Sequence, residues 1–301
     1  MSRWRPSLPE DAMQGSGEQS AAGLPPHWRD SSGLVRRWVW RAVVPSTQSL
    51  AREIAEREGP GILGLADRQD AGRGRRGRRW HSPPGGLWVS LALAPQRPLR
   101  EWPLLTSLAA LALRDTFAQQ AGLTTGIKWP NDLTVRGRKI AGILAETVAA
   151  RHALLGMGVN LALTREQFPA ELRAAATSVR IEVGSAPPRS QFLSRLLERL
   201  AAWLRIWEGE GPAALAAPLR RASLLLDRRV VIRADLRLDG SEAGSRESAA
   251  RGSVRGRVVA LDPLGGLVLE TAEGRRRCVR SGEVAEIDPP LEVMGTPPVR
   301  E

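Results

Sequence analysis

Hydrophobic and polar residues alternate along residues 35–44, VRRWVWRAVV, where Trp38 and Trp40 are interleaved with Arg37 and Arg41. A period of two is the pattern of a β-strand, so this segment is predicted to be a strand that ends at the proline following it. Shorter apolar runs predict further strands over 61–67, 87–94, 126–129 and 152–163. The segments 132–135 and 139–146 flank the polar triplet RGR and predict a hairpin.

Other segments repeat their apolar residues at helical spacing. Leu50 and Ile54 stand one turn apart, and Ser46 or Thr47 precedes them as a candidate N-cap. A later stretch with a wide apolar face is closed by Gly122, which can end a helix. Helices are therefore predicted over 48–58, 104–122, 165–176 and 190–209. In the last of these, one apolar face is formed by Phe192, Leu196, Leu200, Trp203 and Trp207.

The order of these elements predicts an α+β fold, a mixed sheet with helices, because hairpins occur among the strands and argue against a doubly wound fold. From about residue 224 the pattern changes to short strands separated by turn signals, which predicts a small β-barrel. The polar stretch 235–251 is expected to be a long, mobile loop. The predicted parts are a disordered extension over 1–33, a larger domain over 34–222, the barrel over 223–289 and a tail over 290–301.

The charge balance is basic. The 301 residues include 44 Lys and Arg against 32 Asp and Glu, which gives a formal net charge of +12. Such a balance raises nucleic acid as a partner. However, 42 of the basic residues are arginine, and they are spread over a chain that is also rich in Ala, Gly and Pro. This distribution favours a bias of codon usage over a nucleic-acid-binding surface.

Cysteine, apolar runs and histidine limit the class of protein further. The single cysteine, Cys278, excludes an internal disulfide and fits a reducing compartment. No run of 18 apolar residues is present, and residues 1–19 lack the apolar core of a signal peptide. We therefore expect a cytoplasmic protein without membrane contact. The three histidines are scattered without metal-ligand spacing, so no protein-made metal centre is expected.

The segment 67–80, DRQDAGRGRRGRRW, holds six arginines and three glycines between two predicted strands. It could be a disordered tract that binds nucleic acid, or an ordered loop that holds a phosphate. The strands fix both of its ends, glycine lets backbone N–H groups approach an anion, and arginine offers a planar fork to phosphate oxygens. An ordered phosphate-binding loop is therefore favoured, and a solvated or RNA-binding loop is the alternative.

The two lysines of the chain, Lys128 and Lys139, lie close together in KWPNDLTVRGRKIAGIL. In a chain that otherwise uses arginine, this favours a site that requires a compact ammonium group. Between them, WPND places a rigid proline before Asn131 and Asp132, which could contact a nucleotide, a magnesium ion or an amine. The alternatives are two lysines without a special role and an ordinary turn before the next strand.

Taken in order, five segments resemble the motifs of biotin–protein ligases, also called biotin–[acetyl-CoA-carboxylase] ligases. They are PSTQSL at 45–50, Gln69 with GRGRRGRRW at 72–80, KWPNDL at 128–133, RKIAGILAE at 138–146 and GMGVNL at 156–161. The resemblance covers roughly residues 35–290. It implies a catalytic domain of the class II aminoacyl-tRNA synthetase and biotin ligase type, followed by an SH3-like barrel. Lipoate ligases and the synthetases share the type of fold but not this set of motifs.

The resemblance also implies an activity. Members of this family use ATP to convert biotin into biotinyl-5′-AMP and then transfer it to a lysine of a biotin carboxyl carrier protein. Biotin and ATP would be the substrates, and Mg²⁺ is expected with the nucleotide. The polar head of biotin would be bound by Ser46, Thr47, Gln48 and Gln69. Relatives typically have asparagine where this chain has Gln48.

Further roles follow from the same resemblance. Arg73, Gly74 and Arg75 would line biotin and its adenylate as a lid, and Trp80 would pack near the adenine. Lys139 would reach the biotin carboxylate or the phosphate. The nucleotide and the acceptor amine would be contacted by Lys128, Asn131 and Asp132. The catalytic residues would be Arg75, Lys128, Asp132 and Lys139. The pocket floor and the nucleotide edge would be formed by Gly142, Gly158 and Asn160.

Some members of the family carry an N-terminal DNA-binding domain. Only about 35 residues precede the first predicted strand here, and their composition is not that of a folded domain, so a ligase without specific DNA binding is expected. A homodimer is left open by the sequence. Two rival interpretations remain: an RNA-binding protein that uses the arginine-rich segment, and another acyl-adenylating enzyme of this fold that takes lipoate or an amino acid.

Overall fold

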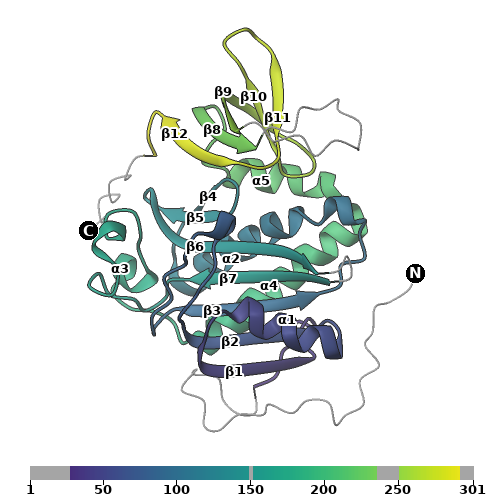
Figure 1. Ribbon diagram of the computed structural model, residues 1–301, viewed down its shortest axis with the longest axis vertical. Helices are drawn as coiled ribbons and strands as arrows, with labels where there is room; N and C mark the ends of the chain where they lie inside the picture. The colour runs from purple at the N-terminus through teal and green to yellow at the C-terminus, as the bar shows by residue number, and fades with distance from the viewer. Residues whose placement is uncertain (1–27, 149–151, 236–250, 292–301) are drawn as a thin grey trace.

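The computed structural model describes residues 28–148, 152–235 and 251–291 (Figure 1). Seven strands form one sheet in the order β1-β2-β3-β7-β6-β5-β4, in which β1 and β2 are parallel and all other neighbours are antiparallel. The strands are β1 (Arg37–Val44), β2 (Ile62–Gln69), β3 (Leu87–Leu93), β4 (Gly126–Lys128), β5 (Asp132–Val135), β6 (Arg138–Val148) and β7 (His152–Val159). The sheet therefore combines a parallel pair with hairpins, which confirms the predicted α+β fold.

Helices cover both faces of this sheet. On one face lies α1 (Thr47–Glu58), and on the other lie α2 (Leu104–Ala121) and α4 (Arg189–Glu210) (Figure 1). The Ser46 side chain caps α1 by accepting a hydrogen bond from the Gln48 backbone N–H, at 3.2 Å. The short α3 (Val179–Val183) and α5 (Ala216–Ala222) were not predicted. Four 3₁₀ turns span Arg75–Gly77, Leu99–Glu101, Ala170–Leu172 and Pro212–Leu215.

The main core lies between the sheet and the pair α2 and α4. Phe192, Leu196, Leu200 and Trp207 of α4 are completely buried, as the helical spacing predicts, whereas Trp203 is only partly buried. Loss of one such large side chain typically costs about 3–5 kcal/mol of stability. This core holds the sheet rigidly from behind, so that the α1 face can carry polar groups.

Five strands form a second, antiparallel sheet in the order β11-β10-β9-β8-β12, which lies above the first in Figure 1. They are β8 (Arg229–Asp235), β9 (Arg251–Leu261), β10 (Leu267–Glu270), β11 (Arg276–Val279) and β12 (Glu283–Asp288). This is the small C-terminal β unit that the sequence predicts. Its apolar core includes Trp129, which follows β4 of the large sheet and donates from Nε1 to the Gly265 carbonyl at 2.9 Å.

Two predictions need correction. The helix predicted over 165–176 is wrong, because this stretch holds only the single 3₁₀ turn Ala170–Leu172, and the residues after it bond to β6 instead. The extension predicted over 1–33 is wrong for its last residues, because Trp28 is buried against Trp38 and donates to the Ser194 hydroxyl. Residues 1–27, the loop interior 236–250 and the tail from 292 lie outside the described residues.

Candidate active site

A pocket lies on the α1 face of the large sheet, over β3, β7 and β6. Its roof is the arginine loop, residues 72–80, and its outer rim includes residues 282–284 of the second sheet. Successive side chains of a strand point to opposite faces, so only every second residue of β6 and β7 faces the pocket. On β6 these are Gly142 and Leu144, and on β7 they are Gly156 and Gly158.

One end of the pocket is lined by buried polar side chains. Thr47 donates from its backbone N–H to Gln69 Oε1 at 2.8 Å, and its hydroxyl shares a 2.8 Å hydrogen bond with Ser90. Gln69 in turn donates from Nε2 to the Ser82 hydroxyl at 2.8 Å. These groups come from α1, β2, β3 and the loop before β3. Because they hold one another in place, this end can bind a small polar ring without rearrangement.

Gln48 extends this polar end toward β7. Its side chain is buried, and among the described residues its Oε1 has no hydrogen-bond partner. That oxygen lies only 3.1 Å from where a Cβ on Gly156 would stand. A glycine at position 156 therefore makes the space that Gln48 occupies, and leaves an acceptor without a partner in the pocket.

The middle of the pocket has a floor of glycine under Trp80. A Cβ added to Gly158 would lie 2.5 Å from Trp80 Nε1, and one added to Gly142 would lie 2.8 Å from the same ring. Any side chain at either position would displace the indole. Trp80 also packs edge-to-face against Trp88, with ring centroids 6.3 Å apart, so the floor brings a flat aromatic surface into the pocket.

The other end of the pocket is charged. Lys139 Nζ lies 2.7 Å from Asp132 Oδ1 and 4.8 Å from the centroid of the Trp80 ring. Lys128 lines the same end. Asn131 donates from Nδ2 to the Ile143 carbonyl at 2.9 Å, which fixes its amide against β6. A cation, a carboxylate and an aromatic face thus meet at one point, a combination suited to a ligand that carries negative charge.

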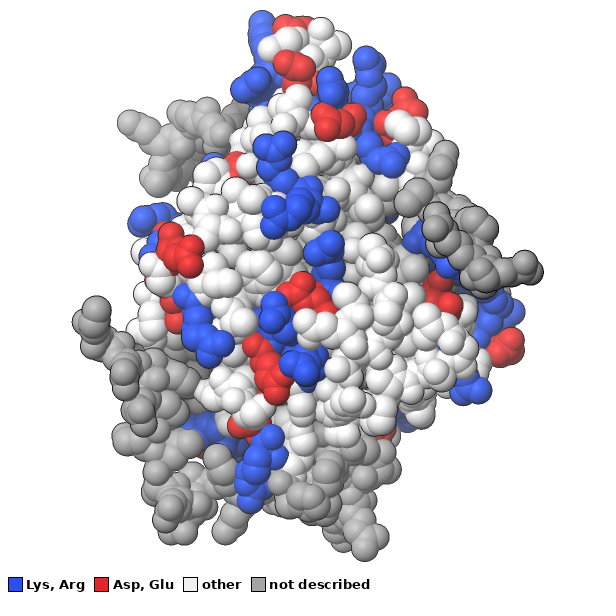
Figure 2. Space-filling view, turned by 180° about the vertical axis from the view of Figure 1, so that it is seen from behind, with Lys and Arg blue, Asp and Glu red and all other residues white. Residues whose placement is uncertain are grey.

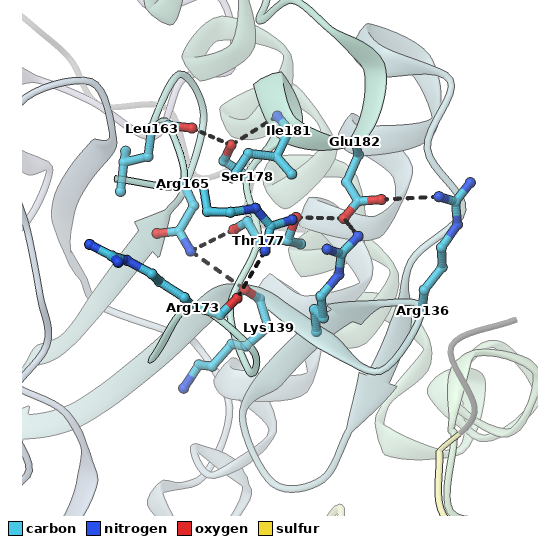
Figure 3. Close-up of polar contacts among 11 residues, drawn as sticks. Arg136, Lys139, Leu163, Arg165, Arg173, Thr177, Ser178, Ile181 and Glu182 are labelled. Atoms are coloured by element: carbon cyan, nitrogen blue, oxygen red, sulfur yellow. Dashed lines mark hydrogen bonds and ion pairs between the residues drawn. The ribbon is translucent and has the colours of Figure 1, made fainter. Parts of the chain in front are cut away.

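The backbone of Lys139 is hydrogen-bonded to the segment 175–177. Between β5 and β6 the register shifts near this residue, so its backbone groups turn to residues 175–177. The Lys139 N–H donates to the Ala175 carbonyl at 2.8 Å, and the Thr177 N–H donates to the Lys139 carbonyl at 2.9 Å. Asn160 donates from Nδ2 to the Thr177 carbonyl at 2.9 Å. Figure 3 shows the Lys139 side chain extending away from this cluster.

A buried carboxylate anchors the same cluster. The Glu182 side chain is only 1% exposed and lies 2.7 Å from Arg138 and 3.6 Å from Arg136 (Figure 3). The Thr177 hydroxyl donates to the same carboxylate at 2.5 Å. Glu182 therefore ties Arg138, the residue before Lys139, and Thr177 to α3. Such a buried, paired charge fixes one arrangement of the backbone.

The arginine loop is ordered by its own backbone. Gly74 N–H donates to the Arg78 carbonyl at 2.7 Å, and Trp80 N–H donates to the Gly72 carbonyl at 2.8 Å. A Cβ on Gly72 would lie 2.5 Å from the Trp80 carbonyl oxygen, so the two ends of the loop approach closely only because this residue is glycine. The sequence-based preference for an ordered loop agrees with this geometry.

The arginine loop also contacts the second sheet. Arg75 donates to the Gly282 carbonyl at 3.3 Å, and Arg78 forms an ion pair with Glu283 at the start of β12. Burial lowers the pKa of the Arg75 guanidinium, although it stays charged at neutral pH. The hydrogen bond from Arg78 lowers the pKa of the Glu283 carboxyl below its ordinary value of 4.5.

The pocket brings together most of the residues that the sequence singled out. They are Ser46, Thr47, Gln48, Gln69, Arg73, Gly74, Arg75, Trp80, Lys128, Asn131, Asp132, Lys139, Gly142 and Gly158. Asn160 is not among the lining residues, because its side chain is buried beneath β6 and bonded to Thr177. Sequence reasoning missed Ser82, Ser90, Gly156, Gly282 and Glu283, of which only Gly156 lay inside a quoted motif.

The surface opposite the view of Figure 1 carries mixed charge. On that face, Lys and Arg side chains lie among Asp and Glu side chains rather than in one basic patch (Figure 2). Within the described residues, no helix has the length and apolar content needed to cross a bilayer. Over the same ranges, no group of three or more His, Cys, Asp and Glu residues could hold a metal ion by itself.

Comparison with known families gives two matches along the chain. Residues 40–160 match the model of the biotin/lipoate A/B protein ligase family, and residues 249–285 match that of the biotin protein ligase C-terminal domain. The first match contains the pocket floor, the arginine loop and both lysines. The second contains the start of β12, which meets that loop.

Individual relatives agree with the family models. The bifunctional ligase/repressor BirA of Bacillus subtilis is 35% identical over 245 residues, which is 79% of this chain and 71% of the relative. The biotin–[acetyl-CoA-carboxylase] ligase of Mycobacterium tuberculosis is 38% identical over 188 residues, 60% of this chain and 68% of the relative. The structure of biotin protein ligase from Aquifex aeolicus in complex with biotin and ATP has a TM-score of 0.67 at 26% identity, covering 82% of this chain and 97% of that one.

Proposed function

Because this chain belongs to the biotin protein ligase family, we propose that it activates biotin with ATP and transfers it to a lysine of a biotin carboxyl carrier protein, such as that of acetyl-CoA carboxylase. The observation that carries the proposal is the arrangement of the pocket. Its buried polar end suits the ring system of biotin, and its charged end suits a carboxylate that meets a triphosphate.

In the first step, a biotin carboxylate oxygen attacks the α-phosphorus of ATP. The bond from that phosphorus to the bridging oxygen breaks, which gives biotinyl-5′-AMP and pyrophosphate. Two anions must approach each other, so cations must offset their repulsion. Lys139 and Arg75 perform this role from opposite sides, one from the floor and one from the arginine loop. Arg73 and Gly74 line the adenylate with Arg75, and Trp80 packs against the nucleotide.

In the second step, the amine of the carrier lysine attacks the acyl carbon of the mixed anhydride. AMP leaves, an amide bond forms, and the attacking nitrogen loses a proton. Asp132 is the carboxylate at this end of the pocket, and it orients the incoming amine together with Asn131 and Lys128. Before this step the anhydride must be protected from water, which the closed arginine loop achieves.

Magnesium is expected with ATP. This ion is often held by one or two carboxylates together with substrate phosphates, and it does not require a cage made only of protein. The single carboxylate of Asp132 beside the cationic end of the pocket fits that arrangement. When bound, the ion would share the charge of the phosphates, while Lys139 and the arginine loop hold the reactants in place.

The domain division forms part of the proposal. Residues 34–222 bind biotin and ATP, and residues 223–289 complete the rim of the pocket through Gly282 and Glu283. A cytoplasmic location is supported by the single cysteine of the chain, which allows no internal disulfide. Specific DNA binding is not part of the proposed function. A titration against duplex DNA should therefore give only weak, salt-sensitive binding, and sedimentation should test for a homodimer.

A ligand screen tests the proposal directly. The purified protein is heated with biotin, lipoate or single amino acids, each with and without ATP and Mg²⁺, and its unfolding temperature is measured. A ligand that binds only the folded chain raises that temperature. Biotin with ATP should give the largest rise and should yield biotinyl-5′-AMP. If lipoate or an amino acid raised the unfolding temperature more than biotin, that compound would be the substrate instead of biotin. If no adenylate formed with any of them, the proposal would be refuted.

A further inference from the structure

The amide of Gln48 can adopt only one orientation. On the side of β6, its nitrogen lies 3.3 Å from the Leu144 carbonyl oxygen and 3.4 Å from Glu146 Oε2. Both of these atoms are hydrogen-bond acceptors. If the amide were turned over, its oxygen would face two acceptors and its NH₂ group would face Gly156 without a partner. The two acceptors therefore hold the nitrogen toward Leu144 and Glu146, and the oxygen toward Gly156, which lines the pocket.

Glu146 is itself fixed by a cation. Arg52, one turn after Gln48 on α1, donates to Glu146 Oε2 at 2.8 Å. This ion pair directs the carboxylate at Gln48, and a carboxylate can only accept a hydrogen bond from the amide. Neither residue of the pair contacts the ligand end of the pocket, since Gln48 and Leu144 lie between them and it.

We propose that Glu146, held by Arg52, is a positioning residue that fixes the polarity of the Gln48 amide and thereby selects a ligand presenting an N–H donor to the pocket. This inference rests on the proposed function, in which that donor is an N–H of the ureido ring of biotin. The nearby hydroxyls of Thr47 and Ser90 can donate or accept as required. Gln48, in contrast, can only accept, so it distinguishes a ring N–H from a ring oxygen or an N-methyl group.

The charge-swapped variant Arg52→Glu/Glu146→Lys tests this inference. The ion pair is kept, but position 146 now donates a charged hydrogen bond, which outweighs the neutral Leu144 carbonyl, so the Gln48 oxygen turns toward position 146 and its NH₂ group faces the ligand. Two donors then oppose each other, and KM for biotin in adenylate formation should rise about tenfold or more. KM for ATP should change by less than about twofold, because the nucleotide lies at the other end of the pocket.

Two further variants keep the result interpretable. Arg37 and Glu58 form an ion pair of matching exposure, 33% and 31% against 35% and 31% for Arg52 and Glu146, and it lies outside the pocket lining. The swap Arg37→Glu/Glu58→Arg should leave both KM values unchanged. Glu146→Leu removes the anchor without inverting it and should give a smaller rise in KM for biotin, since the Leu144 carbonyl still orients the amide.

Ligand selectivity gives a second measurement that a structural role alone would not change. The wild-type protein should prefer biotin to its mono-N-methyl ureido analogues, and the Arg52→Glu/Glu146→Lys variant should lose most of that preference. An unchanged KM for biotin with unchanged selectivity in the folded variants would overturn the inference. If the wild-type protein formed no biotinyl-5′-AMP at all, the proposed function itself would be refuted instead.

Discussion

The floor of the pocket and the arginine loop above it carry similar chemistry but are held in different ways. The floor residues Gly142, Gly158 and Lys139 lie in strands paired on both sides, with the buried Glu182 cluster behind them. The backbone of the arginine loop is hydrogen-bonded within the loop, and its arginines reach the start of β12, while Trp80 at its end packs on the floor. Since opening free energies are low where few buried contacts exist, the loop can move while the floor cannot. We infer that the floor sets geometry and that the loop retains the intermediate.

The largest effect should come from the floor. Lys139→Arg keeps the charge, but a planar guanidinium does not fit between Asp132 and the Trp80 ring as the ammonium does. The rate of biotin-dependent pyrophosphate exchange should fall by about a hundredfold. Lys139→Met serves as the comparison, because it removes the charge altogether. An exchange rate for Lys139→Arg close to that of the wild type would show that charge alone is sufficient at this position.

The next effect should come from the arginine loop and should differ in kind. Arg75→Gly removes the bond to the Gly282 carbonyl, so the loop should open more often. Adenylate formation should persist, while biotinyl-5′-AMP free in solution should rise about tenfold, measured by chromatography after rapid filtration. Arg100→Gly, which removes an exposed arginine outside the pocket lining, is the control. Equal release from both variants and the wild type would argue against retention by the loop.

A smaller effect should appear when the support of the floor is weakened. Glu182→Gln leaves Arg138 without its buried anion and loosens the segment bonded to Lys139. Adenylation kcat should fall about tenfold with little change in KM for biotin. Asp115→Asn is a matched control, because Asp115 is a partly buried partner of Arg199 between α2 and α4, away from the pocket. A similar fall in kcat for both variants would indicate general destabilisation rather than positioning.

The smallest effect concerns the contact between the arginine loop and β12. The pKa of Glu283 is lowered by Arg78, so the ion pair contributes to stability above the ordinary value of 4.5 and is lost as pH falls through the folded-state value. Because the Arg78 side chain is 62% exposed and that of Glu283 is 36% exposed, water screens the pair, and its contribution at neutral pH should be below about 1 kcal/mol. The Glu283→Gln variant should therefore have a slightly lower unfolding temperature than the wild type near pH 7, and this difference should disappear at acidic pH. Glu286→Gln, which removes a more exposed carboxylate on the same strand, is the control.

The sequence predicted the floor better than its surroundings. The family motifs singled out Gly142 and Gly158, and the pairing of β6 with β7 brings both into the lining of the pocket. The rim of the pocket was missed, because Glu283 meets Arg78 only after two distant segments pack together. Ser82 and Ser90 were missed for a related reason. A serine near or within a strand does not indicate a binding site from sequence alone, because the sequence does not show whether its side chain faces the pocket.

One sequence-based prediction failed through tertiary contacts. The stretch 165–176 has helical composition, but residues 175–177 extend along β6 and bond to the backbone of Lys139, which outweighs weak helical propensity. The family resemblance implies that Asn160 lies at the nucleotide edge, and this role stays a prediction. In the structure the strand has ended at Val159, and the side chain of Asn160 turns beneath β6 toward Thr177.

The contact between the arginine loop and β12 has a consequence for biosynthesis. Thr47 and Glu283 are 236 positions apart in the chain (283 − 47), yet both line the same pocket. During synthesis, both segments must therefore leave the ribosome before the binding site for biotin is complete. Prematurely terminated chains would gain little from the stabilisation that substrates give to the finished protein, which leaves them more exposed to cellular proteases.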